Sequence, residues 1–139
     1  MKALIEERER TRKKNGSQER TIFADAVGEL KKSVKGFRGA VISSTIGFPF
    51  AFDLPPEKNP VDVAAACSSI YNTVSDAAAG VGAGEPKYCM VSLGDVVLLS
   101  LKIGASFILM VLLSPDADAN SAIGAAGKTA EKVNSLLAA

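Results

Sequence analysis

The stretch KYCMVSLGDVVLLSLKIGASFILMVLL, residues 87–113, is the most apolar part of the chain, and the rest of the chain must cover it. Its run 96–113 approaches the length of a membrane-spanning helix, which needs about 20 apolar residues. Lys102 disfavours that interpretation, because a charge near the bilayer centre costs at least about 2.5 kcal/mol. Turn-forming residues at 93–95 and small residues at 104–106 favour strands instead. We therefore predict three strands, at 87–93, 96–103 and 106–113.

Side chains alternate between the two faces of each predicted strand, and both faces are largely apolar. The second strand places Val97 and Leu99 on one face, and Leu98 and Ser100 on the other. A sheet with two apolar faces is covered on both sides. We therefore expect helices on both faces, with the face that carries Ser100 and Lys102 the less apolar of the two.

Composition limits the class of protein. The chain has 139 residues and is 47% hydrophobic, which is enough for the core of a single globular unit. It contains no His, which excludes Ser-His-Asp and Cys-His catalysis and every His-ligated metal site. Its two cysteines, Cys67 and Cys89, are too few for a disulfide scaffold, so we expect reduced thiols and a cytoplasmic location. The first 14 residues lack the apolar segment of a secretory signal.

The N-terminal region is basic and the remainder is acidic. Residues 1–38 hold 11 Lys and Arg against 6 Asp and Glu, whereas residues 39–139 hold 5 against 9. We predict a charged helix over 2–14, ended by Asn15-Gly16, and treat residues 1–16 as an extension of a domain at 17–139. This extension is either a solvated helix or an arm that contacts an anionic partner, although the absence of interleaved aromatic residues disfavours nucleic acid. The arm would act through Arg8, Arg10, Arg12, Lys13 and Lys14.

Periodicity predicts the remaining elements. A helix covers 17–35, and a hairpin follows with strands at 38–45 and 48–54. Pro49 places the second of these strands at a sheet edge, and Phe48, Phe50, Phe52 and Leu54 alternate onto one face. Further helices are expected at 61–79 and 118–138. The fold class is therefore α/β (α+β), a three-layer sandwich with a five-stranded, mostly antiparallel sheet and helices on both faces.

The predicted helix at 61–79 carries two neighbouring stripes. We expect the more apolar stripe to face the sheet; it consists of Val63, Cys67, Ile70, Val74, Ala77 and Val81. The second stripe is small and weakly polar, which fits either plain surface or the close approach of a second helix in a dimer. If it is a dimer contact, Ser68→Arg should weaken the dimer. This second stripe is Ala64, Ser68, Tyr71, Ser75 and Ala78.

Two short motifs resemble ligand sites and fail on inspection. The glycine-rich segment 80–84 follows a helix and leads into a strand, the reverse of a phosphate-binding loop, and lacks Gly-Lys-Ser/Thr. Asp116, Asp118 and Asn120 begin like a calcium loop, but Ser121 and Gly127 stand where that loop needs Gly and Glu. We expect the acidic residues to cap the last helix. The sequence thus indicates no catalytic residue, no cofactor and no metal.

The chain resembles the roadblock / dynein light chain family, whose fold is longin- and profilin-like. The resemblance lies in an ordered combination of features rather than in one motif: Gly36-Phe37-Arg38-Gly39-Ala40-Val41-Ile42 leading to Gly47-Phe48-Pro49, one helix after the Pro-rich loop, Gly-Glu-Pro at 84–86, and Ser-Pro-Asp-Ala-Asp-Ala-Asn at 114–120. It implies a non-catalytic homodimer in which the strand after the central helix pairs with its twin. The small-residue stripe would then lie at the contact together with Lys87, Cys89, Val91 and Leu93.

The same resemblance implies a function. Members bind or regulate small Ras-like GTPases, as activators or scaffolds, and reach membranes only through partners. The alternative is a structural adaptor for a motor, membrane or signalling complex that does not depend on nucleotide. A hydrolytic enzyme would need a Ser-Lys pair or a carboxylate dyad, and no polar cluster in the sequence suggests either.

Overall fold

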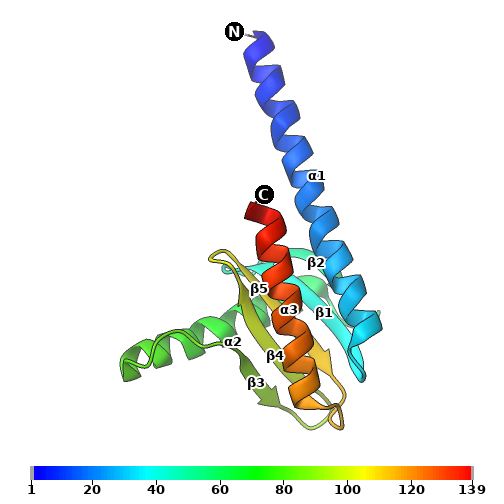
Figure 1. Cartoon of the computed structure of the whole chain (residues 1–139), viewed down its shortest axis with the longest axis vertical. Coiled ribbons are helices and arrows are strands. Elements are labelled where there is room, and N and C mark those ends of the chain that lie inside the picture. The colour runs from blue at the N-terminus through cyan, green and yellow to red at the C-terminus, as the bar shows by residue number, and fades with distance from the viewer. Residues whose placement is uncertain (1, 139) are drawn as a thin grey trace.

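The computed structural model describes the backbone of residues 2–138 and the side chains of residues 18–138. Three helices and five strands follow one another along the chain (Figure 1). Each predicted strand is present, with ends within two residues of the expected ones. The elements are α1 (Lys2–Ser33), β1 (Phe37–Ser44), β2 (Pro49–Asp53), α2 (Pro60–Val81), β3 (Cys89–Ser92), β4 (Val97–Ile103), β5 (Phe107–Leu113) and α3 (Ala119–Ala138).

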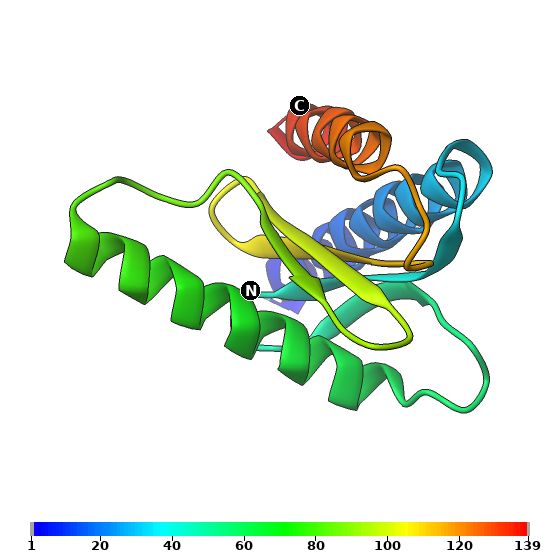
Figure 2. The same ribbon diagram turned by 90° about the horizontal axis from the view of Figure 1, so that it is seen from below.

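The five strands form one sheet in the order β2-β1-β5-β4-β3, and all neighbours run antiparallel. Helices α1 and α3 cover one face and α2 covers the other, so the three-layer sandwich is confirmed (Figure 2). Strand β4 shows how the alternation works. Leu99 and Leu101 belong to the core beneath α1 and α3, whereas Leu98 packs against the core beneath α2.

Helix α1 runs without interruption through Asn15-Gly16, so the prediction of a separate helix ending there is wrong. Glycine inside a helix costs only about 1 kcal/mol relative to Ala. A break would leave several backbone N–H and C=O groups without intrahelical partners, so continuation is favoured. The N-terminal part of α1 consequently extends beyond the sheet (Figure 1).

Within residues 2–138, no helix is long and apolar enough to cross a membrane.

Strand β2 lies at a sheet edge, as Pro49 predicted. Phe48, Phe50, Phe52 and Leu54 were expected on one face of this strand, but Phe50 and Phe52 lie on opposite faces. The register with β1 shifts at a bulge between Ile42 and Ser43. As a result, Phe50 packs in the core beneath α1, with its ring centroid 5.8 Å from that of Phe23. Phe52, two residues later, lies opposite Val41 of the core beneath α2. A bulge of this kind changes which face a side chain occupies.

Candidate interaction surface

Helix α2 begins with a well-defined cap and packs on the sheet with its first half. The Asn59 side chain accepts a hydrogen bond from the Val61 N–H (2.9 Å), and Pro60 occupies the first helical position. The helix packs on β1, β2, β5 and β4. Its buried residues all lie at or before Tyr71, near the middle of the helix: Ala64, Cys67, Ser68 and Tyr71.

Both stripes contribute to the face that packs on the sheet. Cys67 of the more apolar stripe is fully buried and Val63 and Ile70 pack against the same core, as predicted, but the small-residue stripe faces the sheet as well. Ala64, Ser68 and Tyr71 are each at most 7% exposed in the single chain. The β1–β2 turn approaches the helix closely at Ser68, because a Cβ added at Gly47 would lie 3.0 Å from the Ser68 hydroxyl. A large side chain cannot be placed there, so Ser68→Arg would test the fold and not a dimer contact.

The same stripe continues past the edge of the sheet. The second half of α2 projects beyond the strands in both views (Figures 1 and 2). Ser75 and Ala78 follow Tyr71 by four and seven residues, so they point to the same side of the helix, and both are only half-buried. Val81 of the more apolar stripe, at the end of the helix, is 79% exposed. The small-residue stripe is therefore buried by the chain's own sheet as far as Tyr71 and only partly covered beyond it.

Strand β3 provides an open sheet edge next to this part of α2. It pairs with β4 on one side, and no strand of the described chain pairs with it on the other. Of the residues expected at a dimer contact, Cys89 and Val91 are half-buried, whereas Lys87 and Leu93 are exposed. An unpaired edge presents a row of free N–H and C=O groups to another chain.

Two contacts attach the segment after α2 to the sheet. The Tyr71 hydroxyl donates a hydrogen bond to the Pro86 carbonyl (3.2 Å), and Lys102 on β4 lies 4.0 Å from the Glu85 carboxylate. Burial raises the pKa of Tyr71, and the nearby Glu85 carboxylate and Cys89 raise it further. The neutral phenol is therefore favoured, and it fixes where β3 begins. No local pattern indicates this contact, since it joins residues 15 positions apart.

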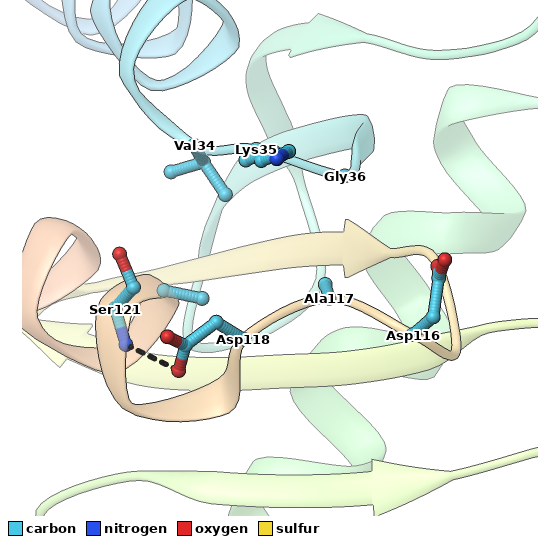
Figure 3. Close-up of a pocket in the computed structure, with 8 residues that line it drawn as sticks. Val34, Lys35, Gly36, Asp116, Ala117, Asp118 and Ser121 are labelled. Carbon is cyan, nitrogen blue, oxygen red and sulfur yellow. Dashed lines mark hydrogen bonds between the residues drawn. The ribbon is translucent and has the colours of Figure 1, made fainter.

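An open pocket lies where the turn after α1 meets the loop between β5 and α3 (Figure 3). Asp118 caps α3 as predicted, because its carboxylate accepts a hydrogen bond from the Ser121 N–H (3.2 Å). The Ser114 hydroxyl donates to Asp116 and, with weaker help from Arg38, lowers its pKa. Both carboxylates therefore stabilise the loop between β5 and α3 and the start of α3. In the part of the chain with described side chains, no three Cys, Asp or Glu residues could together hold a metal ion.

Cys67 yields a prediction for high pH. Burial raises the pKa of its thiol from 9.0 to about 12, an effect that the Ser43 hydroxyl partly offsets. Above pH 9 the unfolded chain loses this proton while the folded chain keeps it, so stability is complete below pH 9 and falls as pH rises. We expect a loss of about 1.4 kcal/mol in the free energy of unfolding per pH unit between 9 and 12.

Urea titrations at several pH values would measure this slope. Cys67→Ala should flatten it, whereas Cys89→Ala, on the edge strand, should leave it as it is in the native chain. Equal slopes in the native chain and in Cys67→Ala would contradict the assignment.

Comparison with known proteins gives matches in sequence and in structure. Residues 24–113 match the model of the Roadblock/LC7 domain. A Roadblock/LC7 domain from Streptomyces avermitilis is similar with a TM-score of 0.77 at 21% identity, covering 84% of this chain and 98% of that chain. MglB from Myxococcus xanthus is similar with a TM-score of 0.77 at 11% identity, covering 84% and 87%. No curated protein sequence matches the chain significantly.

The wider fold is that of profilin. Profilin IB from Acanthamoeba castellanii is similar with a TM-score of 0.58 at 14% identity, covering 81% of this chain and 97% of that chain. MglB has also been solved in a tetrameric arrangement (TM-score 0.72, 17% identity, 82% and 86% covered). These structural similarities establish the shared fold, and the sequence match over more than half of the chain establishes the family. The chain belongs to the Roadblock/LC7 domain family, as its sequence features predicted.

Proposed function

We propose that this protein is a non-catalytic, homodimeric binding module of the cytoplasm that binds and regulates a small Ras-like GTPase. A GTPase is proposed as the partner because GTPase binding is what the resemblance to the roadblock family implies. One structural observation supports the proposed homodimer: the open edge of β3 lies beside the second half of α2, which projects beyond the sheet. Two free thiols, Cys67 and Cys89, suit a reducing compartment.

Self-association through this surface would cover both the free edge of β3 and the exposed part of α2. A second β3 would pair with the free backbone groups of the first, and a second α2 would cover Ser75, Ala78 and Val81. The interface residues in this proposal are Ser75, Ala78, Lys87, Cys89, Val91 and Leu93. Ala64, Ser68 and Tyr71 support that surface from inside the same chain, since they are buried against the sheet.

Regulation in this proposal works by holding the switch loops of the GTPase in one arrangement. Such an effect requires a higher affinity for one nucleotide state than for the other. A second mechanism of regulation is an arginine finger, an Arg side chain that stabilises the transition state of GTP hydrolysis. Arg38 is poorly placed for it, because its guanidinium donates a hydrogen bond to the Asp95 carbonyl (2.5 Å). We therefore favour regulation by state-selective binding over direct insertion of Arg38.

We further propose that residues 1–16 form a charged extension of the domain at 17–139. The match to the family begins at residue 24, so this part of α1 lies outside it. Its basic residues would contact an anionic surface of the same complex. A chain that begins at residue 17 should retain the dimer and lose only that additional contact.

Affinity measurements with purified Ras-like GTPases, loaded with GDP or a GTP analogue, test the proposal. We expect at least a tenfold preference for one nucleotide state, and single-turnover hydrolysis would then separate activation from scaffolding. Equal affinity for both states would instead support the structural adaptor. Absence of binding in both states would overturn the GTPase role while leaving the dimer to be judged by its mass in solution.

A further inference from the structure

The hydrogen-bonding pattern of β3 determines which of its residues can bind another strand. The Leu93 N–H donates to the Val96 carbonyl (2.8 Å), which makes these two residues a hydrogen-bonded pair beside the turn. Such pairs alternate with non-hydrogen-bonded pairs along an antiparallel ladder. In the observed register, Val91 and Cys89 therefore direct their N–H and C=O groups toward β4. Met90 and Ser92 direct theirs outward, to the free edge.

The side chains of β3 divide in the same way. Val91 lies opposite Leu98, which packs on the core beneath α2, so Val91 and Cys89 lie on the α2 side of the sheet. Met90 packs on the core beneath α1 and α3. A second copy that adds its own β3 must match both patterns, with outward-directed residues opposite outward-directed residues. This condition places both α2 helices on the same side of the shared sheet.

We infer that in the homodimer the two β3 strands pair antiparallel about a two-fold axis at Met90, so that Cys89 of each copy lies opposite Val91 of the other. The inference rests on the proposed homodimer and specifies its register. Met90 then pairs with its own counterpart through hydrogen bonds. Ser92 pairs with Tyr88, which precedes the strand, once the strand is extended by one residue.

The two neighbouring registers form fewer backbone hydrogen bonds. An axis at Val91 pairs Met90 with Ser92 but then brings Tyr88 against Gly94, which lies in the β3–β4 turn. An axis at Cys89 brings Ser92 against Pro86, which has no N–H, and whose carbonyl already accepts the Tyr71 hydroxyl. With the axis at Met90 neither problem arises, because every outward-directed residue from 88 to 92 pairs with an outward-directed residue of the second copy.

Disulfide trapping under mild oxidation distinguishes these registers. In the inferred register, Cys89 and position 91 of the second copy form a non-hydrogen-bonded pair, with Cα atoms about 4.5 Å apart, which suits a disulfide. Val91→Cys in the native background should therefore yield a covalent dimer at least tenfold faster than the native chain. Cys67 should not interfere, because it is fully buried.

The matched control is the double variant Cys89→Ser, Val91→Cys. It can cross-link only if position 91 meets itself, as it would with the axis at Val91, so we expect little covalent dimer. Faster cross-linking in this control than in Val91→Cys would overturn the inferred register. Leu93→Cys offers a second check, since with native Cys89 it should cross-link only about the axis at Val91.

Light scattering on the native chain separates failure of this inference from failure of the proposed function. A dimeric mass without cross-linking in any variant would show that β3 is not the contact, and the inference would fall while the homodimer stood. A monomeric mass at high concentration would remove the homodimer itself, and the register with it.

Discussion

Replacing Phe23 by Ala should lower the free energy of unfolding by about 4 kcal/mol. Phe23 is fully buried, and through it α1 contacts the aromatic cluster in the core beneath α1 and α3. Its ring meets those of Phe107 and Phe50 edge-to-face, at centroid distances of 4.8 and 5.8 Å. Because domains are stable by only about 5–15 kcal/mol, this single change removes a large share of the total.

Urea denaturation at a fixed protein concentration measures the effect, since self-association would make the apparent stability depend on concentration. Phe52→Ala is the matched control: the same substitution at a side chain that is 54% exposed should cost about 1 kcal/mol or less. Phe23→Leu, which keeps most of the volume, should fall between the two. Equal losses for Phe23→Ala and Phe52→Ala would show that α1 is not fastened to the sheet through Phe23.

Elements with a strong local signal could be predicted from the sequence. Strand β4 was expected at 96–103 and is found at Val97–Ile103, because its alternation is bounded by turn residues on both sides. The assignment of its two faces is also confirmed, with Leu99 and Leu98 in opposite cores. Pro49 correctly placed β2 at an edge, since a residue without an N–H cannot take part in two ladders.

The wrong predictions rest on local propensity or alternation, which backbone hydrogen bonding over a longer stretch of the chain overrides. The helix break at Asn15-Gly16 was judged from local propensity, which a continuous hydrogen-bond ladder overrides. The bulge between Ile42 and Ser43 moved Phe50 to the other face from Phe52, and nothing in the local alternation marks it. The outward-directed groups of β3 likewise follow from its register with β4 and not from its composition.

The small-residue stripe of α2 is the most informative of these cases. A stripe of small residues indicates close approach by something, and the sequence cannot say whether that is the chain's own sheet or a second copy. In the structure it is the sheet as far as Tyr71, beyond which the stripe continues only partly covered through Ser75 and Ala78. The predicted dimer contact thus narrows to the second half of the helix and β3.

Ala78→Arg should accordingly weaken the proposed dimer by about 3 kcal/mol, roughly a hundredfold in Kd, because it places an unpaired charge in the contact between the two copies. The fold of the single chain should be preserved. Arg has nearly the helix propensity of Ala, and at a half-buried position its long side chain can reach water.

Ala66→Arg is the matched control, with the same substitution on the same helix. Ala66 is exposed and lies five residues before Tyr71, so it points away from the sheet. Sedimentation equilibrium across a range of concentrations should show the native chain and Ala66→Arg as dimers where Ala78→Arg is a monomer. Urea unfolding, extrapolated to low protein concentration, should show similar monomer stability for all three. Equal weakening by the two arginines would indicate a general charge effect, and an undisturbed dimer in Ala78→Arg would place the contact away from the uncovered half of α2.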